Sequence, residues 1–188
     1  MYMKYWLYST LRIIIKPLFL IIFTPKIVNR DNIPKKGNYI LAGNHKHALD
    51  PILLGASINK TILFIAKKEL HEGIKKHFFK AIGTIPVDRK NKNIDFMKNV
   101  IEEINDGYII GIFPEGTRNV KKEDLPYKHG AVSLAKKTNT PIVPFGIKGK
   151  YFPFGGLTIT FDKPLDISNL EIVDATEKLK KTVEKLKR

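Results

Sequence analysis

Short apolar runs alternate with amphipathic stretches along residues 26–188, and this alternation restricts the fold more than any other feature of the sequence. The runs are predicted to be buried strands, while the stretches between them show the spacing of apolar side chains that is typical of helices. Strands that alternate with helices favour an α/β fold with a largely parallel mixed sheet flanked by helices. The expected strands are 38–43, 61–66, 84–87, 108–113, 141–147 and 157–161, the last an outer strand, and the expected helices are 51–57, 69–82, 94–105, 130–137 and 171–187.

Residues 1–25 have a different character, because they are rich in Ile, Leu and aromatic residues that Lys4, Arg12 and Lys16 interrupt. A spanning helix needs roughly 20 predominantly apolar residues. This segment has no uninterrupted apolar stretch of that length. Its aromatic residues suit the head-group region, and its basic residues can contact lipid phosphates. We therefore predict an N-terminal membrane-interface helical segment over 1–25 and one α/β domain over 26–188. The alternative for 1–25 is a helix that packs on the core as a cap.

The charge of the chain limits its partners. Lys and Arg number 33 against 18 Asp and Glu, which gives a net charge of +15. Such an excess favours nucleic acid, anionic lipid or an acidic protein as a partner. We expect no nucleic-acid partner, because the chain has neither an RNA-binding aromatic motif nor a helix-turn-helix signature. The absence of cysteine excludes disulfides, thiolate metal sites and a cysteine nucleophile.

A first candidate site follows the predicted strand 38–43, in the segment NHKHALDP over residues 44–51. Asp50 can pair with His45 or with His47 across the turn, and such a carboxylate orients an imidazole and stabilises its protonated form. The alternative is structural, because Asp50 before Pro51 is also a good helix start. His45 and His47 are two residues apart, so on a strand both would face the same side, as two metal ligands could. The other three histidines have no ligand-like spacing, so we predict no metal site.

Two further segments follow strands in the same way. In FPEGTR, residues 113–118, Gly116 permits an unusual backbone conformation and Arg118 offers a planar fork that suits phosphate. In GTIPVDR, residues 83–89, Arg89 follows a short extended run. The structural alternatives are an ordinary turn for the first segment and a surface salt bridge with Asp88 for the second.

Taken together, these three segments and the later Val143-Pro144-Phe145 occur in an order that resembles the 1-acylglycerol-3-phosphate acyltransferase family of glycerolipid acyltransferases, over residues 30–150. Two positions depart from the family pattern: His47 stands where a small hydroxyl residue is usual, and Phe145 where a smaller residue is usual. The resemblance implies catalytic roles for His45 as general base and for Asp50, which orients it. It implies acceptor or phosphate contacts for Arg89, Arg118, Glu115, Gly116 and Lys67.

The activity that this resemblance implies is transfer of a fatty acyl chain from an acyl carrier protein or coenzyme A thioester to the sn-2 hydroxyl of 1-acyl-sn-glycerol 3-phosphate, which makes phosphatidic acid for phospholipid biosynthesis. The thioester is a co-substrate, and no cofactor is expected. The enzyme would work at the cytoplasmic face of the cell membrane as a peripheral or monotopic protein. The alternatives are another acceptor, such as glycerol 3-phosphate or another lysolipid, and a non-catalytic basic module that binds membrane or nucleic acid.

Overall fold

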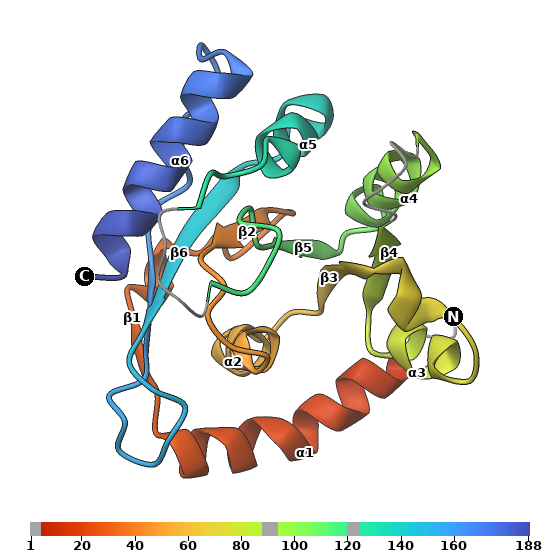
Figure 1. Cartoon of the computed structure of the whole chain (residues 1–188), viewed down its shortest axis with the longest axis vertical. Coiled ribbons are helices and arrows are strands. Elements are labelled where there is room, and N and C mark those ends of the chain that lie inside the picture. The colour runs from red at the N-terminus through yellow and green to blue at the C-terminus, as the bar shows by residue number, and fades with distance from the viewer. Residues whose placement is uncertain (1–4, 88–93, 120–124) are drawn as a thin grey trace.

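The computed structural model describes residues 5–87, 94–119 and 125–188 and contains a seven-stranded sheet with the order β1-β7-β6-β2-β5-β3-β4 (Figure 1). The five strands from β6 to β4 run parallel to one another, whereas β7 is antiparallel to β6 and carries β1 parallel to itself. The predicted largely parallel mixed sheet is therefore confirmed. The strands are β1 (Lys26–Val28), β2 (Ile40–Gly43), β3 (Ile62–Lys67), β4 (Thr84–Val87), β5 (Ile109–Ile112), β6 (Ile142–Lys148) and β7 (Thr158–Phe161).

Helices cover both faces of this sheet (Figure 1). One face carries α1 (Trp6–Phe23) and α2 (Asp50–Ser57), and the other carries α4 (Ile94–Asn105), α5 (Gly130–Thr138) and α6 (Ile172–Leu186). Beside β3 and β4 lie the short turn η2 (Lys68–His71) and α3 (Lys75–Ala81), and η1 (Arg30–Asn32) follows β1.

The central strands are apolar along their whole length because both faces of the sheet are covered. In β2, Ile40 and Ala42 pack in the core under α4, α5 and α6, while Leu41 packs in the core that α1 and α2 cover. This alternation follows from the two-residue period of a strand. The carboxyl ends of β2, β3 and β5 consequently meet at one edge of the sheet, where the segments singled out in the sequence begin.

Two predictions about elements were wrong. The helix expected over 69–82 is divided into η2 and α3, and Gly73 between them has a positive φ of 59°, which a helix does not accommodate. The strand 157–161 is not outermost, because β1 pairs with β7 on its far side. β1 has three residues, too few for an alternating pattern to be recognised.

α1 is long and apolar enough to cross a membrane by length and composition alone. It nevertheless contacts the domain near both ends. Phe19 is buried in the core over α2, and the hydroxyl of Tyr5, directly before the helix, donates to Glu103 Oε1 at 2.7 Å on α4. Pro17 lies inside the helix, which curves along the lower edge of the molecule (Figure 1).

Candidate active site

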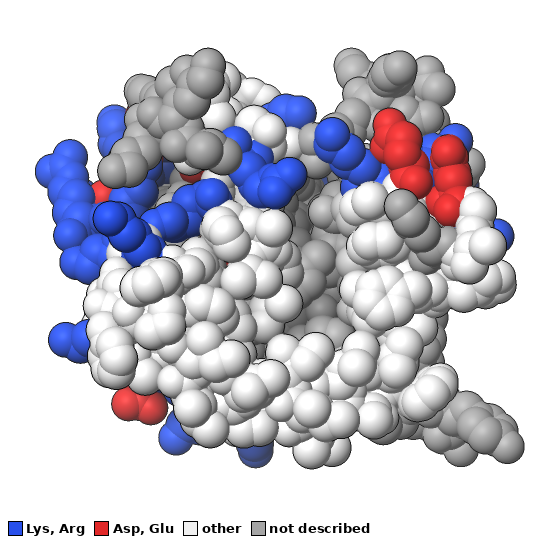
Figure 2. Space-filling model, turned by 60° about the horizontal axis from the view of Figure 1, so that its bottom comes forward, with Lys and Arg blue, Asp and Glu red and all other residues white. Residues whose placement is uncertain are grey.

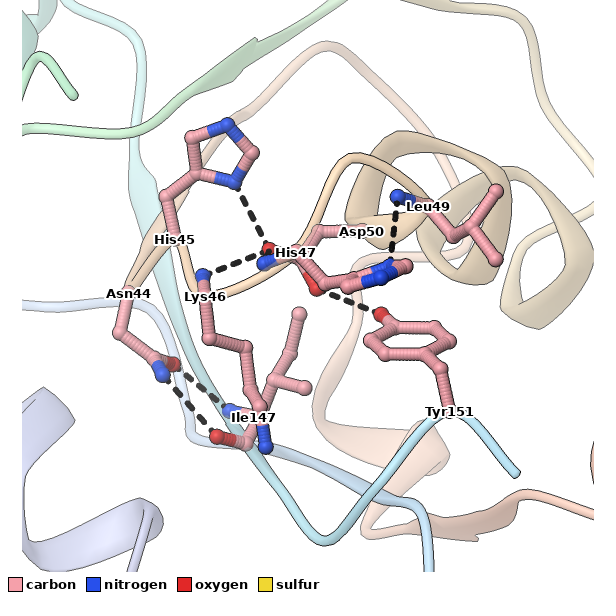
Figure 3. A network of polar contacts seen from close by, with 8 residues as sticks. All are labelled: Asn44, His45, Lys46, His47, Leu49, Asp50, Ile147 and Tyr151. Atoms are coloured by element: carbon pink, nitrogen blue, oxygen red, sulfur yellow. Dashed lines mark hydrogen bonds and ion pairs between the residues drawn. The ribbon is translucent and has the colours of Figure 1, made fainter. Parts of the chain in front are cut away.

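Asn44 holds the loop after β2 in place. Its side-chain amide accepts a hydrogen bond from the Ile147 N–H at 2.7 Å and donates one to the Ile147 carbonyl at 2.9 Å (Figure 3). The amide thus pairs with the backbone of β6 as another strand residue would, which satisfies both groups in a buried position. This contact determines where the chain leaves the sheet and therefore where His45 lies. Sequence analysis assigned no role to Asn44.

Asp50 is the centre of a polar network in this loop (Figure 3). Its side chain is fully buried, at 0% exposure. Oδ2 lies 2.7 Å from His45 Nδ1 and accepts the backbone N–H groups of Lys46 and His47, each at 2.8 Å. Oδ1 accepts the hydroxyl of Tyr151 at 2.5 Å. Four donors therefore surround the carboxylate, which compensates for its removal from water.

The structural alternative, in which Asp50 caps the following helix, is not what the structure shows. α2 begins at Asp50 itself, with Leu49 before it and no side-chain cap hydrogen bond. The carboxylate instead faces back into the loop that precedes the helix, where its oxygens meet the donors just described. Asp50 therefore orders the loop that carries His45, rather than the first turn of α2.

His45 lies between Asp50 and a cavity. Its Nδ1 contacts the carboxylate, so in the neutral ring this nitrogen carries the proton and Nε2 is left as an acceptor. The ring stacks on Phe113 with centroids 4.1 Å apart and an interplanar angle of 18°. It is 17% exposed, and it lines the cavity. The far nitrogen points away from Asp50 (Figure 3), as an imidazole that accepts a substrate proton requires.

His47 is oriented differently. Its backbone N–H bonds to Asp50, but its ring Nδ1 accepts the Leu49 N–H at 3.2 Å and its ring stacks on Tyr151 with centroids 4.5 Å apart. The ring is not among the groups that line the cavity. Of the two histidines that spacing allowed, the structure thus pairs the ring of His45 with Asp50.

Tyr151 is a site residue that sequence analysis missed. It lies in the loop after β6, about a hundred positions from Asp50, so no local pattern could connect the two residues. Burial, followed by the nearby charge of Asp50 and the hydrogen bond to it, raises the pKa of the Tyr151 phenol. The hydroxyl consequently remains protonated and acts as a donor to the carboxylate.

The segment FPEGTR forms the loop after β5. Its residues Gly116 and Glu115 differ in whether they line the cavity. Gly116 has a φ of 68°, and a Cβ there would lie 2.8 Å from the side chain of Lys128. Gly116 lines the cavity. Glu115 is buried and is not among the residues that line the cavity, and its side chain accepts a hydrogen bond from the His45 backbone. Burial raises the pKa of Glu115 to about 7, opposed by a hydrogen bond from the His45 backbone.

Among the described residues, five cationic side chains line the cavity, and two of them, Arg12 and Lys16, belong to α1. The other three come from elsewhere in the chain. Lys67 ends β3, Arg118 follows Gly116, and Lys128 precedes α5. None of these three side chains makes a hydrogen bond or ion pair with another described residue. Lys128 was not singled out from the sequence, where it is one of many lysines. Arg89 lies outside the described residues.

The remainder of the cavity is mostly apolar, and its volume is about 970 Å³. Its walls come from α1, α2, η2 and α3, with Leu11, Ile15, Leu70 and Phe78 among the contributing side chains. A pocket of this size accommodates a molecule larger than a typical small metabolite. The arrangement offers a general base and an anion site at one end, with an apolar compartment beside them.

Nothing in the described ranges groups three or more His, Asp or Glu side chains in a way that could hold a metal ion.

Comparison with known proteins bears directly on this arrangement. Residues 24–148 match the family model described as Acyltransferase, and this range includes His45, Asp50 and the loop after β5. The chain belongs to this acyltransferase family. The resemblance seen in the sequence is therefore confirmed, and the alternative of a non-catalytic basic module is wrong.

Individual relatives agree with the family assignment. The acyltransferase is 33% identical over 168 residues to a Bacillus subtilis protein named 1-acyl-sn-glycerol-3-phosphate acyltransferase, which covers 86% of this chain and 83% of that protein. It is 38% identical over 133 residues to a probable enzyme of the same name from Mycoplasma pneumoniae, and there it spans about half of the relative, 48%.

A solved structure agrees as well. The crystal structure of the 1-acyl-sn-glycerophosphate acyltransferase from Thermotoga maritima matches with a TM-score of 0.72 and 25% identity, over 95% of this chain and 79% of that one. The match extends beyond the family model and includes most of the chain.

Proposed function

We propose that this acyltransferase moves a fatty acyl chain from an acyl thioester to the sn-2 hydroxyl of 1-acyl-sn-glycerol 3-phosphate, which yields phosphatidic acid. The observation that carries the proposal is the position of His45, paired with Asp50 at 2.7 Å, in a cavity that combines cationic side chains with an apolar compartment. This acceptor has a phosphate, a hydroxyl and an acyl chain. The cationic side chains suit the phosphate, His45 suits the hydroxyl, and the apolar compartment suits the acyl chain. The names of the relatives support the same acceptor.

In the proposed reaction, His45 acts as the general base. Nε2 takes the proton of the acceptor hydroxyl as its oxygen attacks the thioester carbonyl. The tetrahedral intermediate then expels the thiolate, which takes the proton back from the imidazolium and leaves as the thiol. Asp50 stabilises the imidazolium between these two steps. The attack can be direct, because the chain has neither a cysteine thiol nor a Gly-x-Ser-x-Gly segment that would carry an acyl group.

The cationic side chains are assigned to the acceptor phosphate. Arg118 provides a planar fork, while Lys67 and Lys128 provide point charges. Their contact with the phosphate would position the hydroxyl beside His45 and reduce the entropic cost of the reaction. We assign Gly116 the role of leaving room for the acceptor beside the backbone of its loop. Arg89, which the family resemblance implies, is assigned to the same phosphate. Glu115 supports this loop.

The same proposal places the protein on the cytoplasmic face of a membrane, lying along it rather than crossing it. α1 exposes a stripe of large apolar side chains, among them Ile14, Leu18 and Ile21. Its contacts through Tyr5 and Phe19 would have to break if the helix crossed the bilayer. An apolar helix bound along its length suits the interface.

Release of free thiol from acyl thioesters tests the reaction. Purified protein is supplied with acyl carrier protein or coenzyme A thioesters and with lysophosphatidate, glycerol 3-phosphate or another lysolipid, dispersed in detergent. We expect thiol release that depends on lysophosphatidate, with phosphatidate as the product and no resident cofactor needed. Preferential turnover with glycerol 3-phosphate would show that the acceptor is wrong. The two donors, compared at one acceptor, decide which carrier is used.

A further inference from the structure

The loop between β6 and β7, residues 149–157, carries two large apolar side chains that the proposed reaction does not use. Phe152 is 68% exposed and Phe154 is 90% exposed, and neither lines the cavity. Phe154 also has a φ of 59°, a conformation that bulky residues rarely adopt. Backbone strain of this kind persists only where the surrounding structure maintains it. The loop therefore holds an aromatic side chain in water at a conformational cost.

The backbone of this β6–β7 loop closes on itself. The N–H of Lys150 donates to the Gly155 carbonyl at 2.9 Å, and the N–H of Gly155 donates to the Phe152 carbonyl at 2.9 Å. A Cβ on Gly149 would lie 2.1 Å from the carbonyl oxygen of Gly156, so the two arms approach as closely as glycine allows. The tip is preformed, and a ligand that binds it has little chain entropy to overcome.

The tip of the loop lies beside one end of α1. Tyr151, at the base of the tip, packs against Phe19 and Phe23 with ring centroids 6.3 Å and 5.9 Å away. Figure 1 shows the loop next to the left-hand end of α1, at the same lower edge of the molecule. The exposed phenylalanines and the apolar stripe of α1 therefore belong to neighbouring parts of one surface.

The charges on these two elements all have one sign. Residues 1–30 and 148–161 contain no Asp or Glu, and among their cations Lys26, Lys148 and Lys150 do not line the cavity, whereas Arg12 and Lys16 do. The face that comes forward in Figure 2, which includes α1, is mostly uncharged in its middle, with Lys and Arg gathered above it on the left and both acidic and basic side chains above it on the right. Apolar side chains combined with cations and no anions complement a bilayer that contains anionic lipid.

We propose that the β6–β7 loop is a second membrane-binding element beside α1, and that it inserts Phe152 and Phe154 into the boundary between head groups and acyl chains of an anionic bilayer. The inference rests on the proposed activity at a membrane surface. The helix along this face and the loop beside one of its ends together define the orientation of the molecule on the bilayer. The cavity wall formed by α1 is then held against the lipid from which the acceptor comes.

Vesicle sedimentation tests the proposal with the whole chain. The vesicles consist of phosphatidylcholine with or without phosphatidylglycerol. The double variant Phe152→Ser/Phe154→Ser is expected to bind the anionic vesicles about tenfold or more weakly than the unmodified protein. Val173→Ser is the control, because Val173 is 65% exposed in the first turn of α6, which Figure 1 shows at the upper edge, away from α1. Unchanged vesicle binding of the double variant would overturn the proposal.

Turnover in detergent separates this proposal from the proposed function. The double variant is expected to keep its activity on lysophosphatidate dispersed in detergent, since neither phenylalanine lines the cavity. Normal vesicle binding together with a change of oligomeric size on gel filtration would instead make the loop a protein interface, which contradicts the proposal. An inactive unmodified protein that still loses vesicle binding on mutation would contradict only the proposed reaction.

A fluorescent probe measures insertion directly. Trp6 is the single tryptophan of the chain. In a Trp6→Phe background, Phe154→Trp places the only indole at the tip of the loop. We expect its emission to shift to shorter wavelength on addition of anionic vesicles, and to be quenched by brominated acyl chains. Emission that stays typical of water while the protein sediments with the vesicles would show that the loop does not insert.

Discussion

At the scale of single residues, Asp50 connects parts of the chain that are distant in sequence. It accepts hydrogen bonds from the loop after β2 and from Tyr151 in the loop after β6, and it faces His45. A buried carboxylate with this many donors is held in one orientation, which in turn orients the imidazole. The residue-scale predictions concern these groups and the cations across the cavity.

The two neighbouring histidines are expected to differ in their effect on turnover. General-base catalysis contributes typically ~10²–10⁴-fold, so His45→Ala should lose activity on about that scale while the protein stays folded. Asp50→Asn should also lose much of the rate, because an amide stabilises an imidazolium less than a carboxylate does. His47→Ser, whose ring lies outside the cavity, should keep most of the activity. Turnover with one donor and one acceptor, with thermal unfolding as the control, checks this. An active His45→Ala with an inactive His47→Ser would reverse the assignment.

Tyr151 is expected to act as a positioning residue. Tyr151→Phe removes the hydrogen bond to Asp50 Oδ1 and leaves a buried oxygen without its donor, a loss of about 1–3 kcal/mol. We expect kcat to fall by about tenfold, with little change in the Michaelis constant for either substrate. Tyr39→Phe is the matched control, because its buried hydroxyl has no partner in the described structure. Equal effects of both substitutions on kcat would assign Tyr151 only a packing role.

Arg118 and Lys128 should serve acceptor binding. Arg118→Lys keeps the charge but loses the fork, and Lys128→Met loses the charge. A charge-assisted hydrogen bond contributes about 1.5–3 kcal/mol, so Lys128→Met should raise the acceptor Michaelis constant by about tenfold or more. Arg118→Lys should raise it less, and Lys136→Met on the exposed side of α5 should not change it. An effect confined to the thioester constant would contradict the assignment to the acceptor.

At the scale of elements, α1 has two functions in the structure. Its inner side contributes Phe19 to the core and Tyr8, Leu11 and Ile15 to the cavity, while its outer side exposes large apolar residues. Deletion of residues 1–24 would remove both sides at once, so loss of activity would not separate membrane binding from the loss of a cavity wall. Substitution of the outer side alone is the sharper experiment.

We expect the triple variant Ile14→Ser/Leu18→Ser/Ile21→Ser to leave the membrane fraction. These side chains are 63%, 55% and 74% exposed, so their replacement removes apolar surface that would face lipid without opening the core. Sedimentation with anionic vesicles and turnover in detergent are the measurements. Binding should fall while the unfolding temperature and the turnover in detergent stay close to those of the unmodified protein. Full retention on vesicles would place the main membrane contact elsewhere.

At the scale of the whole molecule, Glu115 connects the site to global stability. It lies buried under the loop after β5, close enough to α6 for the charges of Glu184 and Lys187 to affect it. Its pKa is about 7 in the folded protein and near 4.5 when exposed to water. Because the folded form binds the proton more tightly, the contribution of Glu115 to stability falls as the pH rises from about 4.5 through about 7.

Glu115→Gln is therefore expected to be more stable than the unmodified protein at pH 8, and this difference should shrink towards pH 5. The shift in pKa corresponds to at most about 3 kcal/mol, and the amide oxygen still accepts the bond from the His45 backbone. Denaturant unfolding at both pH values measures the difference. Glu177→Gln, on the exposed side of α6, should show no such trend. A difference that does not depend on pH would mean that Glu115 does not titrate in this range.

Most of the fold followed from local patterns in the chain. The apolar runs of β2, β5 and β6 and the periodic faces of α4 and α6 could be recognised because period and length report burial directly. The errors occur where the local pattern is short or interrupted, as in the three residues of β1 and at Gly73 between η2 and α3. The motifs around His45 and Gly116 could also be found, since each follows a strand whose end is a natural site.

Spacing and motif order alone identified the family, the α/β fold and the segments that carry the chemistry, because strand period, helix period and a turn of a few residues are local properties of a chain. Contacts between distant segments depended on folding. Only the packed sheet brings Tyr151 to Asp50, selects His45 over His47 as its partner, and adds Lys128 to the cations of the cavity. It also turns Glu115 away from the cavity towards the core. These outcomes depend on which strands are neighbours, and no short-range pattern encodes that order.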